Sequence, residues 1–382
     1  MNFINFVQRQ KELLQLFCLG KDVDIQESAL EIRFFHFDSE YHYMKEPEGS
    51  NRMDDDSSIV ENRSFSYPVF VDKRYKKATD VIILLHGLNE RSWDKYLCWA
   101  EYLATQTRKP VILFPIAYHI NRSPFQWSDP RSMSLLVKKR QQRVGVNHSL
   151  CFANVALSER LSEDPTRFYN SGCQTVEDLT TLVRQIKQGE HPLFASDASV
   201  DFFAYSIGAF LSEITLMSNP EGLFDQSKLF VFCGGSIFRE MFGESRCIMD
   251  KPAYERLLQY YCKEWFSKEP IDHGDELEKT DRTLKAFNAM IVPDIDREKR
   301  EGFFSNLGCR LSGILLKKDI VMPYEGVEAC MGHDMTARHF TLMDFPYEYT
   351  HEAPFPTNGR VDSALLNASF NAIFSEAALF LS

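Results

Sequence analysis

Short runs of apolar residues alternate along the chain with longer segments in which apolar side chains recur every three or four positions. The short runs are typical of strands buried on both faces of a sheet, and the longer spacing is that of one helix face. Strands are expected at residues 81–85, 111–114, 200–205, 229–233, 311–316 and 340–343. Helices are expected at residues 92–105, 175–187, 207–217, 252–265, 275–290 and 363–379. The alternation predicts an α/β fold, a mostly parallel doubly wound sheet with helices on both faces.

The alternation is interrupted after the strand 229–233, which is the sixth of the sheet when early strands are counted, and we expect a helical cap inserted at residues 236–307. The core would then comprise residues 65–235 and 308–382, and residues 1–64 would form an N-terminal helix and early strands. An acidic stretch at residues 53–58 indicates an exposed loop. Residues 119–172 form a long excursion that contains a helix-like basic piece.

Composition narrows the class of protein. Of the 382 residues, 44% are apolar and 13% aromatic, which suits a large core and argues against disorder. A net charge of -11 disfavours nucleic acid as a partner. No stretch resembles a membrane span or a signal peptide. The nine cysteines form no CxxC pair, so a reducing cytoplasmic location is expected.

Ser206 is the candidate nucleophile. An apolar strand ends at this serine and a helix begins at once, with Ala204 and Gly208 two positions away on either side. A sharp strand-to-helix turn needs small residues at those positions, and it lifts the hydroxyl above the sheet next to a helix N-terminus. The alternative is an ordinary serine N-cap.

With these features the chain resembles the α/β-hydrolase superfamily over residues 65–382. His86-Gly87-Leu88-Asn89 directly follows the strand 81–85, where the family has an HG turn that supplies an oxyanion-hole amide. The resemblance implies that the backbone N–H groups of Leu88 and Ile207 are the two donors. The alternative is a simple turn after a strand.

The resemblance also implies an acid and a base. Residues 313–323 (GILLKKDIVMP) look like the family's strand and acid loop, which assigns Asp319 as the acid. The last strand leads into residues 346–351 (PYEYTH), a loop that could return His351 to the serine as the base. The order Ser206, Asp319, His351 is that of the superfamily. The competitors are less well placed: His333, His339, Glu325 and Asp344.

Other side chains are candidates for substrate contact. His86, Asn89 and Tyr205 flank the catalytic groups, and Arg122 and Trp127 follow a strand on the side where active-site loops collect. The basic residues between Arg131 and Arg143 could steer an anionic substrate, although a solvated helix face is the simpler interpretation. The aromatic residues of the insertion either roof a pocket or form core. No nucleotide or metal motif is present, so neither a cofactor nor a metal is expected.

These patterns predict a serine hydrolase that acts on a small molecule with an acyl group, through an acyl-enzyme. An esterase or lipase-like enzyme is the first interpretation, because an aromatic-rich cap suits an apolar acyl group. A peptidase or thioesterase would use the same chemistry. A hydrolase-fold protein that binds a ligand without turnover is the alternative from another class. The sequence assigns neither the natural substrate nor an oligomeric state.

Overall fold

The computed structural model describes residues 4–26, 28–41, 56–267 and 277–382. Within these residues nine strands form one sheet with the order β1-β2-β3-β5-β4-β6-β7-β8-β9. The strands are β1 (Val23–Asp24), β2 (Leu30–Asp38), β3 (Ser64–Asp72), β4 (Ala78–Leu85), β5 (Val111–Leu113), β6 (Phe194–Tyr205), β7 (Leu229–Phe232), β8 (Leu311–Leu316) and β9 (Phe340–Met343). Of the predicted exposed loop at 53–58, residues 53–55 lie outside the described residues; Asp56–Ser58 form a short 3-10 helix in which Asp56 is ion-paired to Arg160 and Arg167.

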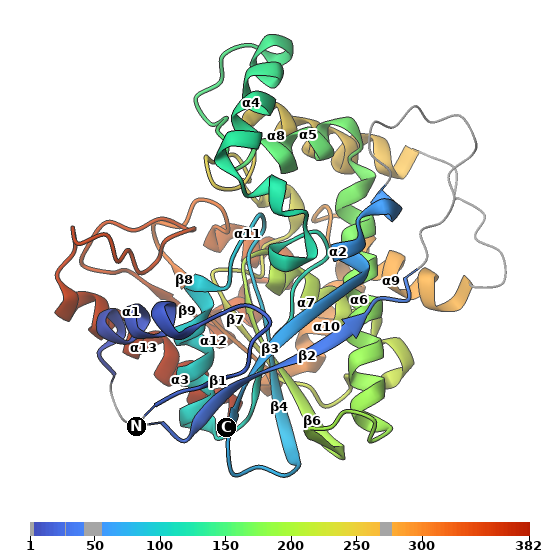
Figure 1. Cartoon of the computed structure of the whole chain (residues 1–382). Coiled ribbons are helices and arrows are strands. Elements are labelled where there is room, and N and C mark those ends of the chain that lie inside the picture. The colour runs from blue at the N-terminus through green and yellow to red at the C-terminus, as the bar shows by residue number, and fades with distance from the viewer. Residues whose placement is uncertain (1–3, 27, 42–55, 268–276) are drawn as a thin grey trace.

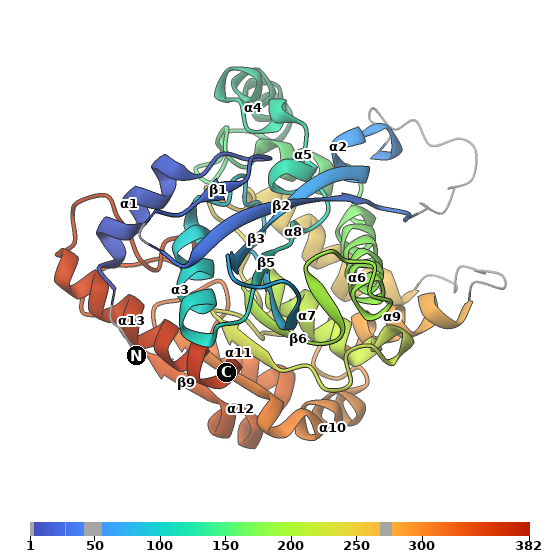
Figure 2. The same ribbon diagram turned by 60° about the horizontal axis from the view of Figure 1, so that its bottom comes forward.

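The sheet is parallel from β5 to β9, and β1, β2 and β3 extend it as an antiparallel edge. Helices cover both faces: α3 (Leu97–Thr107) and α13 (Ser363–Leu381) lie on one side, and α6 (Thr166–Lys187), α7 (Ile207–Ser218) and α9 (Leu277–Ala289) on the other (Figure 2). The predicted mostly parallel, doubly wound α/β fold is confirmed. The strand order reverses beside β4, because β5 lies on one side of it and β6 on the other. Such a reversal opens a crevice at the carboxyl ends of the strands.

Alternating side chains of the central strands separate two hydrophobic cores. Ile83 and Phe202 join the core under α6 and α7, whereas the adjacent Ile82 and Phe203 join the core under α3 and α13. The two-residue period of a strand produces this division, and it explains why the buried strands are apolar at almost every position. The predicted strands therefore form the rigid centre of the molecule.

A helical layer lies above the carboxyl ends of the strands (Figure 1). The segment between β7 and β8 contributes α8 (Lys251–Gln259), and the excursion after β5 contributes α4 (Pro130–Val144) and α5 (Val155–Glu163). A buried ion pair joins the two segments, since Arg140 of α4 donates two hydrogen bonds to Asp250, the N-cap of α8. The layer is thus built from two distant stretches of sequence. The remainder of the insertion, α9 and α10 (Arg297–Leu307), lies lower, and α9 packs beside α7.

The C-terminal helix corrects one expectation, because α13 is long and apolar enough to cross a membrane by length and composition. Half of its most apolar window is buried inside the protein. Phe370 and Phe374 lie within 6.1 Å of Tyr102 of α3, measured between ring centroids. The first helix, α1 (Phe6–Leu16), docks on α13 through stacked Phe6 and Phe370 rings. Core helices of soluble proteins pass the same composition test, and α13 packs as one.

Candidate active site

Ser206 occupies a strained turn between β6 and α7, as its φ of 57° and ψ of -124° show. A residue other than glycine is held in this region only when the surrounding structure determines it. The surroundings are tight here: a Cβ atom at Gly208 would lie 2.7 Å from the carbonyl oxygen of Leu85 and 2.8 Å from that of His86. Only glycine fits, so α7 starts directly against the end of β4. The serine side chain is thereby lifted above the sheet.

Three side chains form a hydrogen-bonded chain at this point. His351 Nε2 lies 2.7 Å from Ser206 Oγ, and His351 Nδ1 lies 2.7 Å from Asp319 Oδ2. Asp319 is fixed in turn, because its Oδ1 accepts the backbone N–H groups of Val321 and Met322 at 2.9 and 3.0 Å. All three triad side chains are buried. The structure brings together the three residues that the sequence singled out.

Tyr205 holds the histidine in place. Its hydroxyl donates a hydrogen bond to the backbone carbonyl of His351, and its ring stacks on the imidazole with an interplanar angle of 14°. His351 stands at the tip of a tight turn, where Thr350 and Ala353 pair across a short antiparallel bridge. The residue before the nucleophile therefore orients the base. Tyr205 is buried and positions His351, so the predicted substrate contact is wrong for this side chain.

The turn after β4 lies over the nucleophile, and a Cβ atom at Gly87 would be 3.5 Å from Ser206 Cβ. Gly87 N–H donates to the hydroxyl of Tyr96 at 2.9 Å, and that hydroxyl donates to Glu90 Oε1 at 2.8 Å. Leu88 and Ile207 both line the adjoining pocket. Among the described residues the backbone N–H groups of these two have no hydrogen-bond acceptor. Two free amides beside the serine are the arrangement that an oxyanion hole requires.

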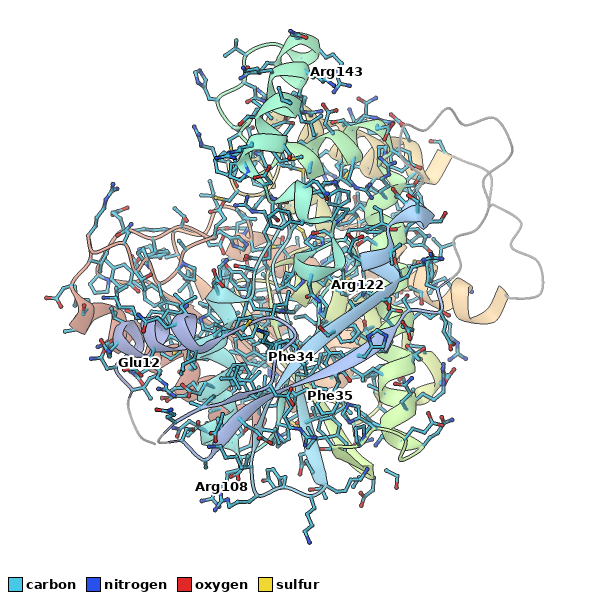
Figure 3. The ribbon with its side chains drawn as sticks, viewed as in Figure 1. Glu12, Phe34, Phe35, Arg108, Arg122 and Arg143 are labelled. Atoms are coloured by element: carbon cyan, nitrogen blue, oxygen red, sulfur yellow. The ribbon has the colours of Figure 1, made fainter. Side chains whose placement is uncertain are left out.

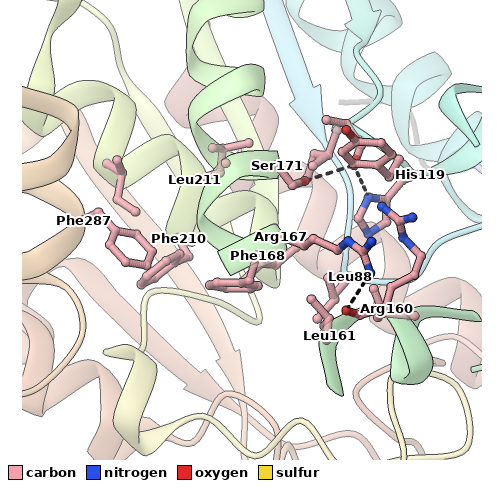
Figure 4. Close-up of a pocket in the computed structure, with 17 residues that line it drawn as sticks. Leu88, His119, Arg160, Leu161, Arg167, Phe168, Ser171, Phe210, Leu211 and Phe287 are labelled. Carbon is pink, nitrogen blue, oxygen red and sulfur yellow. Dashed lines mark hydrogen bonds between the residues drawn. The ribbon is translucent and has the colours of Figure 1, made fainter. Parts of the chain in front are cut away.

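An apolar pocket adjoins this turn, and with its mouth it holds about 690 Å³ of space not occupied by protein atoms. Figure 4 shows Phe210, Leu211 and Phe287 at one end, and His119, Arg160 and Arg167 at the other. The insertion supports the apolar end from behind, because Tyr261 packs on both Phe168 and Phe287 with ring centroids 5.7 and 5.4 Å apart. Of the predicted aromatic residues of the insertion, Phe238, Tyr261 and Trp265 thus form the packing behind the pocket wall, whereas Phe242 and Tyr254 pack on each other.

His86 and Asn89 support the site from outside the pocket. His86 is fully buried, and its Nε2 accepts the backbone N–H of Ile116 at 3.0 Å. Burial keeps the pKa of His86 well below its ordinary value, so the ring is neutral. Asn89 Nδ2 donates to the carbonyl oxygens of Ala153 and Cys247, which connects the turn to the helical layer. Neither side chain lines the pocket; the burial of His86 excludes substrate contact, whereas for Asn89 such contact stays a prediction.

The prediction that Arg122 contacts substrate is wrong. Its guanidinium is fully buried and ion-paired to Asp178 at 2.7 Å, and it also donates to the carbonyl oxygens of Pro115 and Asn62. Figure 3 shows Arg122 beside the sheet, far below Arg143 at the outer end of α4. An arginine in a loop looks accessible in the sequence, because its partner Asp178 is distant along the chain.

Trp127 also lies outside the pocket, and the Arg160 guanidinium stacks on its ring at 4.5 Å. The basic residues of α4 likewise divide by environment. Arg140 is buried in its ion pairs with Glu159 and Asp250, whereas Arg131, Lys138 and Lys139 are exposed. The exposed ones form the solvated helix face that was the simpler interpretation.

The sequence missed the side chains that line the pocket. Tyr118 and His119 follow β5, and Phe168, Phe210 and Phe287 come from three different helices. These residues have no common spacing, since the fold brings them together from distant segments. Within the described residues no group of three His, Cys, Asp or Glu side chains could hold a metal ion.

The doubly wound sheet, the serine on the strand–helix turn, and the acid and base that follow it in sequence define an α/β-hydrolase. More particularly, the chain belongs to a family of unknown function, DUF6051, whose model matches residues 4–382. No curated protein matches the sequence.

Remote likenesses to solved esterase structures accompany this membership. A bacterial heroin esterase is 11% identical, with 94% of this chain and 85% of that chain covered and a TM-score of 0.45. Carboxyl esterase 2 from the mycorrhizal fungus Tuber melanosporum is 9% identical, with both chains fully covered and a TM-score of 0.45. A Pyrobaculum calidifontis esterase is 11% identical, with 98% and 90% covered and a TM-score of 0.44. Likenesses this remote do not assign an activity.

Proposed function

We propose that the protein is a serine hydrolase that cleaves a carboxylic ester through an acyl-enzyme. The single observation that carries the proposal is the hydrogen-bonded chain from Ser206 through His351 to Asp319. A serine hydroxyl is a weak nucleophile unless an adjacent base takes its proton, and an oriented imidazole supplies that base.

The reaction follows from the geometry. His351 Nε2 accepts the Ser206 proton as Oγ attacks the carbonyl carbon, and Asp319 stabilises the imidazolium that forms. The Leu88 and Ile207 amides donate to the developing oxyanion. His351 then protonates the leaving alkoxide, and water attacks the acyl-enzyme with the histidine again acting as base.

The pocket favours an ester with an apolar acyl part. Its end near Phe210, Leu211 and Phe287 is lined by buried apolar side chains, and Leu88 and Ile207 line the same pocket. Burial of each methylene there contributes about 0.8 kcal/mol, so a chain of several carbons gains substantial binding energy. Amides and thioesters would use the same groups, and substrate profiling separates the three.

A fluorophosphonate probe tests the nucleophile. Wild-type protein should be labelled covalently, and Ser206→Ala should not be labelled. Ser134→Ala is the matched control, because Ser134 is exposed on α4, away from the site. Equal labelling of wild type and Ser206→Ala would refute the assignment.

A series of p-nitrophenyl esters with increasing acyl length tests the reaction class. We expect kcat/KM to rise with chain length until the apolar end is filled, and to vanish in Ser206→Ala. Matched amides and thioesters should be slower. Absence of turnover on all three classes, with an intact fold, would favour a protein that binds a ligand without hydrolysing it.

A further inference from the structure

The loop that follows β5 forms one wall of the pocket and is held rigidly from behind. Arg122 Nη1 donates to the carbonyl oxygen of Pro115 at 3.1 Å, and Asn62 Oδ1 accepts the backbone N–H of Tyr118 at 3.0 Å. Thr175 Oγ1 accepts the backbone N–H of Ala117 at 3.0 Å. A buried polar network therefore fixes the loop at several points.

Two residues of this loop have a left-handed backbone. Tyr118 has a φ of 65° and Ile120, a β-branched residue, has a φ of 51°. Such conformations cost free energy and persist where the surrounding structure determines them, which is common at ligand-binding sites. Here the strain turns the side chains of Tyr118 and His119 toward the pocket, which both of them line.

Both side chains present a polar atom without a partner. Among the described residues, His119 Nε2 and the Tyr118 hydroxyl are buried atoms with no hydrogen bond. His119 is only 6% exposed. Buried polar groups are nearly always paired, so two orphaned atoms on neighbouring residues of one pocket wall indicate a site for a polar ligand group.

Which ring nitrogen of His119 carries the proton determines which ligand group can bind to this wall of the pocket. Its Nδ1 lies 2.9 Å from the carbonyl oxygen of Ala117, an atom that can only accept, so Nδ1 carries the proton (Figure 4). Burial lowers the pKa of His119 to about 4, which keeps the ring neutral. Nε2 is therefore an acceptor that needs a donor, and it would repel a carboxylate.

A cation at the same end of the pocket excludes a second class of ligand. Arg160 lines the same end of the pocket, stacked on the Tyr118 ring at 4.9 Å, and would repel an ammonium group. Its charge is balanced by Asp56, whose Oδ1 lies 2.9 Å from Nη1, although the angle between the two groups makes no hydrogen bond. A neutral hydroxyl satisfies every condition, since it donates to His119 Nε2 and accepts from the Tyr118 hydroxyl.

We propose that Tyr118 and His119 form a subsite for a hydroxyl group of the substrate, opposite the apolar end of the pocket. The inference rests on the proposed ester hydrolysis and specifies the substrate as a hydroxyl-bearing ester with an apolar part. The hydroxyl belongs either to the alcohol, as in a glycerol ester, or to the acyl chain. In both cases a hydroxyl group would bind to His119 Nε2 and the Tyr118 hydroxyl, and the substrates below distinguish the two sources.

Two matched substrate pairs test the subsite. Monooctanoylglycerol against ethyl octanoate varies the alcohol, and p-nitrophenyl hydroxyoctanoate against p-nitrophenyl octanoate varies the acyl chain. The hydroxylated member of one pair should have a kcat/KM about tenfold higher, because without it the buried polar atoms stay unpaired. The pair that shows the preference identifies the source of the hydroxyl.

Variants test whether the two residues carry that preference. His119→Asn keeps a donor near the carbonyl oxygen of Ala117 but removes Nε2, and Tyr118→Phe removes the hydroxyl. Each should reduce the preference to within about twofold of unity, measured as the ratio of kcat/KM for the two members of a pair in the same variant. His119→Gln, whose amide reaches the position of Nε2, should retain part of it. Tyr75→Phe and His333→Asn are the matched controls at exposed positions, and they should keep the wild-type preference.

Calorimetric binding to Ser206→Ala separates this inference from the proposed function. Monooctanoylglycerol or the hydroxyoctanoate ester should bind about tenfold tighter than its plain partner, even if wild type turns over no ester. If wild-type protein is neither labelled by the fluorophosphonate probe nor able to hydrolyse any ester, the proposed hydrolase function alone is refuted. Equal binding and equal rates within both pairs, or variants that lower both members of a pair equally, would overturn the subsite.

Discussion

At the scale of single residues, the catalytic turn depends on the absence of a side chain at Gly208. An alanine Cβ at this position would lie within 2.8 Å of two carbonyl oxygens of the β4 end. We expect Gly208→Ala to lower the free energy of unfolding by about 1–3 kcal/mol and to abolish most activity, because the backbone must shift. Urea titration and ester hydrolysis measure the two effects.

Gly302→Ala is the matched control. Gly302 is exposed within α10, and no heavy atom lies within 4 Å of its added Cβ. The substitution should raise the free energy of unfolding by about 0.5–1 kcal/mol, since alanine favours a helix. A similar loss of stability in both variants would show that the close approach at Gly208 is not the cause.

Asp319 is predicted to act through the tautomer of His351. In Asp319→Asn an amide nitrogen would face Nδ1, so the imidazole would carry its proton on Nε2 and could not accept from Ser206. We expect kcat to fall about 100- to 10,000-fold with little change in KM. Steady-state kinetics on a p-nitrophenyl ester, with circular dichroism as the check on folding, measures this. A loss below about threefold would contradict the role.

The sequence located the triad residues but misjudged the side chains around them. Ser206 was found because its turn needs small neighbours within two positions, a purely local signal. Arg122 was misread because its burial depends on Asp178, which lies on another element. His119 carried no signal at all, since its environment depends on β5, α6 and a strained loop that form only in the folded chain. The sequence therefore reveals residues that a local turn requires, but it does not reveal contacts between segments that are distant along the chain.

At the scale of elements, the turn after β4 is held by one hydroxyl. Tyr96 accepts from Gly87 N–H and donates to Glu90, so it fixes both ends of the segment that carries Leu88. Tyr96→Phe should lower kcat about tenfold and leave KM nearly unchanged, because the oxyanion donor would be less well placed. Kinetics on a short and a long ester should show the same loss. A change confined to KM would contradict a positioning role.

Helix α7 contains a buried acid that predicts a pH dependence of stability. Among the described residues, neither carboxyl oxygen of Glu213 has a hydrogen-bond partner, and burial raises its pKa well above the ordinary value of 4.5. At a pH above 4.5, Glu213 of the unfolded chain releases its proton, whereas Glu213 of the folded chain keeps it. The free energy of unfolding should therefore fall as pH rises from about 4.5 toward the raised pKa, by at most about 1.4 kcal/mol per pH unit.

Glu213→Gln removes the titrating group, and its stability should lack this fall. Urea titrations of both proteins across the pH range, taken as a difference, isolate the contribution of Glu213. Parallel curves for the two proteins would refute a neutral Glu213. The same comparison distinguishes a buried acid from the exposed carboxylates, which both proteins share.

At the scale of the whole molecule, α13 completes the core on one face of the sheet. Phe374 is fully buried and lies against Trp99 and Phe203, with ring centroids 5.3 and 5.5 Å away. Phe374→Ala should lower the free energy of unfolding by about 3–5 kcal/mol. Leu379→Ala, at an exposed position of the same helix, should change it by no more than about 0.5 kcal/mol. Equal small effects would indicate that α13 does not pack as described.

The docking of α1 on α13 has a consequence for synthesis. Ile4 and Asn371 exchange hydrogen bonds, so the side of α1 that faces α13 is covered by residues made about 360 positions later, whereas its contacts with α3 involve residues made about 90 positions later. Ribosomes add about 5–20 residues per second, which leaves that face waiting for about 20–70 seconds. During this interval the side of α1 that faces α13 stays uncovered in the nascent chain. Slow codons late in the message should therefore lengthen the time during which α1 lacks its contacts with α13.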